Sequence, residues 1–198
     1  PKKMADSNRV ENQIFDKSFI KKELNQHLSL QLSATRLKAV WFDIPSKTYI
    51  GFQYFELINS AWDVIKKELI KNLNYQSVSL SLINNKYTLV PKGLFNEQNK
   101  ADFLDFNHGE FDSEISFDSI TSQDAILVYA LNNELINSIK HDFPGIKIQH
   151  ACKSLIEAIS NDELAKDKCL FVNIQENSFD ISLIRQKKLY FFNSFTYK

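Results

Sequence analysis

The chain has 198 residues, of which 43% are hydrophobic and 13% aromatic, so it is long enough to bury the core of one domain or of two small lobes. Basic and acidic residues number 24 each, so the net charge is zero and no chain-wide positive field exists to attract nucleic acid or an anionic membrane. The four glycines (Gly51, Gly93, Gly109 and Gly145) are too far apart to form a phosphate-binding loop, which excludes the P-loop and the dinucleotide fingerprint.

The chain has few cysteines and no long apolar segment. Cys152 and Cys169 are its only cysteines and form no C-x-x-C pair, so we expect reduced thiols rather than a disulfide scaffold. The longest apolar run, Ala125–Leu131, is much shorter than the roughly 18 residues that span a bilayer. Residues 1–11 do not have the pattern of a signal peptide. Together these features predict a cytoplasmic protein without a membrane span.

The N-terminal third is predicted to contain an arm followed by an antiparallel sheet. In residues 1–27, scattered apolar side chains have a spacing that fits a short amphipathic helix or an arm packed on the body. Apolar and polar residues then alternate, which predicts a three-stranded meander with short polar turns. The predicted strands lie at 28–33, 37–44 and 49–57.

A helix and a hairpin are predicted next. Apolar residues recur at helical spacing over 60–72, and a hydroxyl followed by an acid at 60–63 forms a capping box at its start. Two β-rich runs follow, at 78–82 and 87–90. They are separated by the two asparagines at 84–85, a pair that tolerates left-handed turn geometry, and they therefore predict a hairpin.

Residues 101–139 form the one region with an uneven charge. They contain no Lys or Arg, which predicts either a solvated acidic face or a docking site for a basic partner. A calcium loop starting at Asp105 is excluded, because its sixth position lacks glycine and its twelfth, Ser116, is not glutamate. The acidic residues are Asp102, Asp105, Glu110, Asp112, Glu114, Asp118, Asp124 and Glu134.

The rest of the chain predicts alternating strands and helices and then a second meander. The predicted elements are a fully buried strand at 125–131, a helix capped by Asn132, a turn at 144–145, a short strand at 146–148, a helix at 151–160, a polar linker at 161–168, and strands at 170–174, 179–184 and 189–195.

The last of these strands is rich in aromatic residues. Uncovered, it would present an aromatic edge to which another chain could pair. We therefore expect a further segment of a longer protein, or a partner strand, to cover it, and Pro1 in place of methionine agrees with a fragment or with methionine removal. The aromatic residues are Tyr190, Phe191, Phe192, Phe195 and Tyr197.

Several short runs, in this order, resemble a known family. They are LSLQLS at 28–33, YTLVPKGLF at 87–95, FLDFN at 103–107, LFVNI at 170–174 and FNSF at 192–195. They resemble a bacterial family of unknown function, domain-of-unknown-function family 3822, over about residues 28–198. The order of the elements is similar to that of the actin-like ATPase superfamily, in particular PilM and FtsA. The resemblance implies an α/β, actin-like (ribonuclease H-like) fold with a small α+β insert and a partial second lobe.

The same resemblance implies four segments. Residues 1–27 would be an N-terminal arm, and 28–85 the first lobe. Residues 86–150 would be an inserted α+β subdomain that resembles the PilM/FtsA insert. Residues 151–198 would return to the first lobe and form the first meander of the second.

PilM-like proteins carry a phosphate-1 signature in the first meander: an aspartate between two glycines, followed by a lysine. On this chain the two glycines fall at Ser29 and Ser33, the aspartate at Gln31 and the lysine at Lys38. Only Lys38 keeps the residue of the family, and a lone lysine on a strand is typical of a solvent-facing charge.

The phosphate-2 signature, aspartate-hydrophobic-glycine, falls on Asn173, Ile174 and Gln175. Magnesium prefers carboxylates and phosphates, so amides at Gln31 and Asn173 supply neither the charge nor a base for an attacking water. Side chains at Ser33 and Gln175 would intrude where glycine lets backbone amides approach a phosphate. The resemblance therefore predicts no catalytic residue, no metal and no cofactor, with ATP and magnesium disfavoured.

Two functions stay open. The first is a non-catalytic actin-like scaffold in the cytoplasm that binds a protein partner through the acidic insert or the final strand, and no nucleic acid. The alternative is a nucleotide-binding protein or ATPase with a divergent pocket that uses Lys38. An unrelated enzyme is disfavoured, because the histidines lack metal-site spacing and Cys152 beside His150 lacks an orienting third group.

Overall fold

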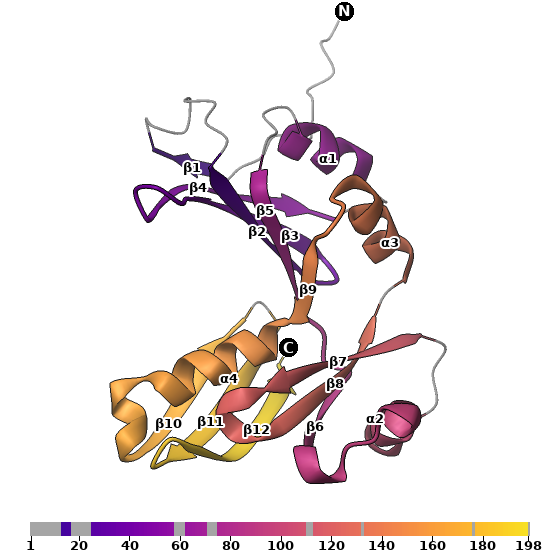
Figure 1. Cartoon of the computed structure of the whole chain (residues 1–198), viewed down its shortest axis with the longest axis vertical. Coiled ribbons are helices and arrows are strands. Elements are labelled where there is room, and N and C mark those ends of the chain that lie inside the picture. The colour runs from indigo at the N-terminus through magenta and orange to yellow at the C-terminus, as the bar shows by residue number, and fades with distance from the viewer. Residues whose placement is uncertain are drawn as a thin grey trace, which may run out of the picture. The chain divides into compact units, whose positions relative to one another are not determined.

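The computed structural model describes residues 13–16, 25–57, 62–70, 75–109, 113–131, 133–175 and 177–197 (Figure 1). Its contacts divide the chain into two compact units. The first unit comprises Pro1–Ile83 and Glu134–Ile148, and the second comprises Asn84–Asn133 and Gln149–Lys198.

The first unit is built on a six-stranded sheet. In order across the sheet, its strands are β1 (Gln13–Phe15), β4 (Thr48–Glu56), β3 (Arg36–Asp43), β2 (Gln26–Leu32), β5 (Tyr75–Leu82) and β9 (Lys147–His150). The predicted meander is confirmed, because β2, β3 and β4 pair antiparallel in sequence order. Alternation decides which side chains face the core: Leu28, Leu30 and Leu32 are buried, whereas the residues between them are half-buried.

The described part of the N-terminal arm is a strand and not a helix. β1 pairs antiparallel with β4, and the Phe15 ring lies 5.5 Å from the Trp41 ring between centroids. The expectation that the arm packs on the body is thus confirmed for residues 13–16. The rest of the predicted arm, apart from residues 25–27, lies outside the described residues.

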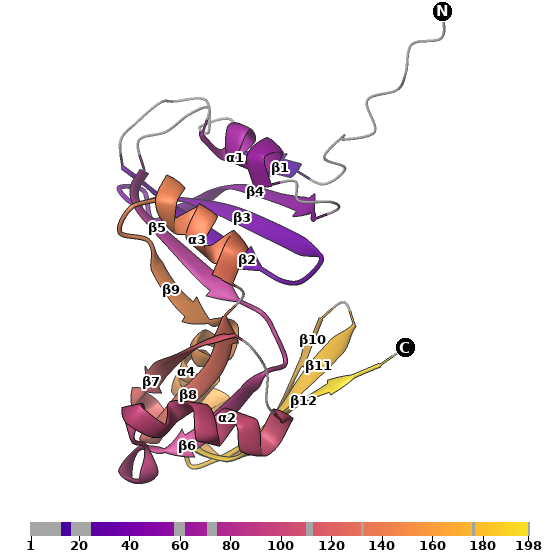
Figure 2. The same ribbon diagram turned by 90° about the vertical axis from the view of Figure 1, so that its right-hand side faces the viewer.

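Among the described residues, two helices belong to this unit, α1 (Trp62–Ile70) and α3 (Asn133–Asp142), and both lie on one side of the sheet in Figure 2. The predicted helix at 60–72 is confirmed over the nine residues of α1, while its capping residue Ser60 and the predicted cap Asn132 of α3 lie outside the described residues.

The predicted hairpin around residues 84–85 is wrong. β5 follows a helix and pairs in parallel with β2, whereas the next strand, β6 (Tyr87–Pro91), belongs to another sheet. A helical connection allows a strand to pair in parallel with an earlier strand of the same sheet. Because β5 pairs in this way with β2, the asparagines after it do not form a hairpin with β6. Asn84 instead shapes the connection, because its amide donates to the carbonyl of Ala130 (2.9 Å) and its Oδ1 accepts from the main-chain N of Lys86 (2.9 Å).

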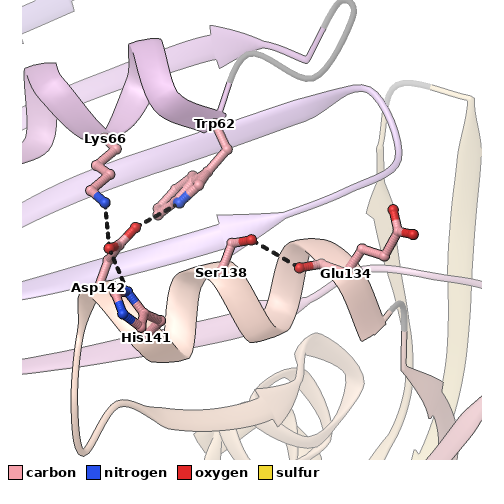
Figure 3. Close-up of polar contacts among 6 residues, drawn as sticks. All are labelled: Trp62, Lys66, Glu134, Ser138, His141 and Asp142. Carbon is pink, nitrogen blue, oxygen red and sulfur yellow. Dashed lines mark hydrogen bonds and ion pairs between the residues drawn. The ribbon is translucent and has the colours of Figure 1, made fainter.

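Asp142 joins the two helices of the first unit (Figure 3). Its side chain, 7% exposed, accepts hydrogen bonds from Trp62 Nε1 (2.9 Å) and Lys66 Nζ and lies 3.1 Å from His141 Nδ1. Burial alone would raise the pKa of this carboxyl, but the contacts with Lys66, Trp62 and His141 hold it below its usual value. This clamp, formed by Asp142 with Trp62 and Lys66, links α3 to α1 within the first unit. The four-segment domain assignment itself stays a prediction.

We expect Asp142→Ala to lower the free energy of unfolding of the first unit by about 2 kcal/mol, because the Trp62 N–H and the Lys66 ammonium lose their acceptor. Urea unfolding followed by tryptophan fluorescence measures this, since both tryptophans, Trp41 and Trp62, lie in this unit. Glu134→Gln is the matched control: Glu134 is exposed, and only its main-chain oxygen is used, by Ser138 Oγ (3.0 Å). An equal loss in both variants would show that the clamp does not stabilise the unit.

The second unit contains two three-stranded sheets. The first has the order β6, β8 (Ala125–Leu131), β7 (Glu114–Ile120), and the second the order β10 (Lys168–Ile174), β11 (Ser178–Arg185), β12 (Lys188–Thr196). Its helices are α2 (Lys100–His108) and α4 (Ala151–Asn161), with short 3-10 turns at Lys92–Leu94, Glu97–Asn99, Thr121–Gln123 and Glu163–Lys166.

Most predicted elements of this half of the chain are confirmed. β8 is the expected buried strand, α4 the expected helix, and β10, β11 and β12 the expected second meander. The short strand β9 and the turn before it, with Gly145 at φ 80°, are confirmed as well.

One expectation for the acidic region is wrong. Asp118, assigned to a solvated face, is only 9% exposed and accepts a hydrogen bond from the main-chain N of His150 (2.8 Å), with Lys153 Nζ 3.9 Å away. It lies on β7, whose alternation turns it inward. Burial is the largest influence on this carboxyl and raises its pKa. Glu110 and Asp112 lie outside the described residues.

Candidate functional site

The turn between β2 and β3 occupies the phosphate-1 position of the resemblance, and its own residues close it. Ser33 N donates to the carbonyl of Arg36 (2.8 Å), and Arg36 N donates to Ser33 Oγ (3.0 Å), which in turn lies 3.2 Å from that same carbonyl. The hydroxyl of Ser33 therefore takes the place at the Arg36 amide that an anion would need.

Two of the three other residues of this signature, Gln31 and Lys38, are neighbours across the strands. Gln31 pairs with Lys38, and Lys38 pairs with Tyr54 on the next strand, so the three side chains share one face of the sheet. Gln31 is half-buried and Lys38 is exposed. The nearby Arg36 is bound by Glu56 (Nε to Oε1 2.7 Å) and lies 5.3 Å from the centre of the Tyr54 ring.

The end of β10 occupies the phosphate-2 position, and there both amides bind a buried carboxylate. Asn173 Nδ2 and Gln175 Nε2 each donate to Asp180 Oδ2 at 2.9 Å, and Ser194 Oγ donates to Asp180 Oδ1. Asp180 is 2% exposed. An ionised carboxylate only accepts hydrogen bonds, so three neutral donors are well matched to it.

The polar network continues from Ser194 to Tyr87. The Tyr87 hydroxyl lies 2.6 Å from Ser194 Oγ, and the Tyr87 ring lies 5.1 Å from the His150 ring and 6.0 Å from that of Phe192. Burial raises the pKa of the Tyr87 hydroxyl well above its usual value, so this group stays protonated and acts as a hydrogen-bonding group.

His150 is a buried helix cap. Its Nδ1 accepts from the main-chain N of Cys152 (3.2 Å) at the start of α4, and its Nε2 lies 3.2 Å from the Asn84 carbonyl. An acceptor Nδ1 and a carbonyl beside Nε2 assign the neutral tautomer with the proton on Nε2. Burial lowers the pKa of His150 to about 4 and raises that of the Cys152 thiol. The pair is thus bound through the main chain and does not form a nucleophile–base dyad.

The chemistry of these groups is that of satisfied hydrogen bonds. In the described part of the chain, every buried side-chain nitrogen or oxygen has a hydrogen-bond partner. Within the same residues, no three His, Cys, Asp or Glu side chains gather as metal ligands. Likewise, none of the described helices has the length and apolar character needed to cross a membrane.

The resemblance assigns Gln31, Ser33, Lys38, Asn173 and Gln175 to the two phosphate positions, but it does not indicate Asp180, which binds the last two. A signal for it exists: β11 alternates so that Asp180, Ser182 and Ile184 point inward, and all three are buried. A carboxylate at an inward position of a strand needs donors, and the amides of Asn173 on β10 and of Gln175 just after it supply them.

Comparison with known proteins supports the fold. The model of a family described as protein of unknown function (DUF3822) matches residues 16–198. A Bacteroides thetaiotaomicron protein with actin-like ATPase fold and unknown function is similar in structure, with a TM-score of 0.78 at 15% identity, over 89% of this chain and 72% of that one. A chain of the PilM-PilN type IV pilus biogenesis complex is similar with a TM-score of 0.56 at 16% identity, over 86% of this chain and 61% of that one. No curated protein matches the sequence.

These likenesses confirm the predicted fold class, an α/β chain with the actin-like fold. At sequence identities of 15% and 16%, structural similarity is evidence for the fold alone, whereas the family match extends over nearly all of the sequence. The chain therefore belongs to the DUF3822 family of proteins of unknown function.

Proposed function

We propose that this chain is a non-catalytic actin-like domain that serves in the cytoplasm as an interaction or assembly scaffold for a partner protein. The observation that carries this proposal is that the chain's own side chains occupy both turns where an actin-like nucleotide site would bind phosphate. Ser33 closes the first turn, and Asn173 and Gln175 are bound to Asp180 in the second.

The chemistry of the second turn argues against a bound nucleotide. A phosphate placed there would have to break the hydrogen bonds that Asn173 and Gln175 make and would meet the carboxylate of Asp180. A phosphate and this carboxylate carry like charges, which repel each other more strongly in a buried site than in water. Gln31 and Asn173 also lack the charge that magnesium requires.

Exposed apolar surface supports a binding role. On β10, the outward side chains Leu170, Val172 and Ile174 are 62%, 53% and 76% exposed. On the final strand, Tyr190 is 62% exposed and Phe191 43%. Apolar side chains gathered on one sheet are typical of a surface that a partner or a further segment of the same protein covers, and PilM, similar in fold, is known in a complex with PilN.

One observation favours the alternative of a divergent nucleotide site. Lys38 is exposed and lies beside Gln31, so its ammonium is available to an anion. In that case the protein would bind nucleotide through Lys38 with slow or no hydrolysis.

Isothermal titration of ATP, ADP and GTP with magnesium into the full-length natural protein separates the two functions. We expect no saturable heat and no thermal shift at millimolar nucleotide, whereas a ligand at 100 times its dissociation constant would stabilise the protein by about 2.7 kcal/mol. Micromolar binding that Lys38→Ala abolishes, and that Lys67→Ala on the exposed side of α1 does not, would establish the alternative.

A further inference from the structure

A pocket of about 390 Å³ lies between strand β6 and helix α2, within the second unit. Figures 1 and 2 both show α2 beside this strand. β6 stands at the end of its sheet, so among the described residues only β8 pairs with it. We call this the β6–α2 groove; its lining includes Leu89, Pro91, Leu94, Asp102, Phe103 and Phe106.

The rim of the groove carries large apolar side chains that the fold does not use. Phe106 is 90% exposed and Leu94 is 71% exposed. Helix α2 packs on its sheet through other residues, the fully buried Leu104 and the half-buried Phe103, whose ring lies 6.1 Å from that of Phe95. Two exposed apolar side chains at one pocket are a favourable contact for an apolar ligand group.

The edge of β6 also offers hydrogen-bonding groups. The bonds from Ala130 N to the Lys86 carbonyl and from Lys92 N to the Asp124 carbonyl fix which residues of β6 face β8. Antiparallel pairing alternates, so the N–H and C=O of Leu89, a residue that lines the groove, point away from β8. The Tyr87 carbonyl on the same edge is bound by His108 Nε2 (2.9 Å), and Pro91 has no N–H, so the open edge is limited to Leu89.

The charge around the groove is negative on the α2 side. Asp102 lines the groove and Asp105 follows one turn later, whereas Lys100 at the start of α2 lies over the Phe117 ring (5.9 Å) and Lys92 is exposed beside Pro91. The side-chain amide of Asn107 already donates a hydrogen bond to Thr88 Oγ1 (2.8 Å) within the protein. A ligand that complements this surface is apolar at its centre and positive at its flanks.

We propose that the β6–α2 groove binds an extended segment of a partner protein in which one large apolar side chain is flanked by lysine or arginine. The apolar side chain fills the pocket against Leu94 and Phe106, the segment's backbone pairs with Leu89, and a basic side chain meets Asp102. This inference rests on the proposed scaffold function and names the kind of partner segment that one surface takes.

The test is a titration of the isotope-labelled chain with the peptide Gly-Thr-Lys-Thr-Phe-Thr-Lys-Thr-Gly, followed by amide shifts in NMR. We expect saturable shifts at Leu89, Asp102 and Phe106, and at least tenfold weaker binding when alanine replaces the phenylalanine or glutamate replaces both lysines. No saturable shift at these residues, or equal binding of the glutamate peptide, would overturn the proposal.

Variants make the test specific to the groove. Phe106→Ser should weaken the binding of the lysine peptide about tenfold without unfolding the protein, since Phe106 is exposed. Asp102→Lys should reverse the preference in favour of the glutamate peptide, whereas Glu114→Lys, an exposed acid on β7, should change neither. If neither the peptide nor a nucleotide binds, the proposed peptide site is refuted and the scaffold function is not. If a nucleotide binds, the scaffold function is refuted, whether or not the peptide binds.

Discussion

Lowering the pH from 7.5 to 4 is expected to destabilise the second unit by about 3 kcal/mol through His150 alone. The pKa of this histidine is about 4 in the folded chain against 6.5 for an ordinary histidine. Between these values the unfolded chain binds more protons than the folded one, so the stability is complete above pH 6.5 and is lost as the pH falls toward 4. Each unit of pKa difference corresponds to about 1.4 kcal/mol.

The cause of this shift is structural. His150 is 1% exposed, and its Nδ1 already accepts a hydrogen bond from Cys152 N, so a second ring proton would break the cap of α4 in a desolvated site. The carboxylate of Asp180 favours the charged ring, but the effect of burial is larger.

His150→Asn isolates the effect, because an asparagine oxygen can cap the helix yet does not titrate. Hydrogen exchange of the α4 amides as a function of pH should show a much flatter profile between pH 6.5 and 4 in this variant. His141→Asn is the control, since the side chain of His141 is 86% exposed. If His150→Asn keeps the full pH dependence of the wild type, the buried neutral histidine is not its source.

The fold was most predictable where strands alternate strictly. The alternating apolar and polar residues around Leu30 and Val172 predict the two meanders, because one face of each strand is apolar and the turns are short. The partner of β5 was not predictable from its own residues, since the asparagine pair suggested a local turn while the preceding helix fixed a parallel pairing. Helix α2 and strand β7 were missed, because polar residues interrupt the apolar period of both.

The contacts of the candidate site were not predictable from the sequence. The resemblance located Asn173 and Gln175, but not that both amides bind Asp180. Charge counting likewise placed Asp118 on the surface, although the strand turns it toward His150. A net charge over a segment does not report the direction of each side chain, and that direction decides whether an acid is solvated or needs donors.

Asn173→Asp is expected to cost the second unit about 3 kcal/mol at pH 8, because it places a carboxylate oxygen 2.9 Å from Asp180 Oδ2, where an N–H now donates. Two carboxylates at this distance are expected to share one proton and to hold it well above pH 4. The folded variant then binds more protons than its unfolded chain, so its stability should fall as the pH rises from 5 to 8, opposite to the effect of His150.

Urea unfolding at pH 5 and at pH 8, monitored by hydrogen exchange of the amides of β10 and β11, measures the change in stability between the two pH values. Asn193→Asp is the matched control, because Asn193 is exposed on the same sheet and an aspartate there still accepts from Ser194 N. Magnesium at 10 mM should recover part of the loss in Asn173→Asp and leave the wild type unchanged, since only the variant offers paired carboxylates. A loss that is equal at both pH values, or the same in the control, would mean that Asn173 does not serve to neutralise Asp180. A pH-dependent loss would instead show that a neutral donor at position 173, beside the buried Asp180, lets the turn fold without a cation.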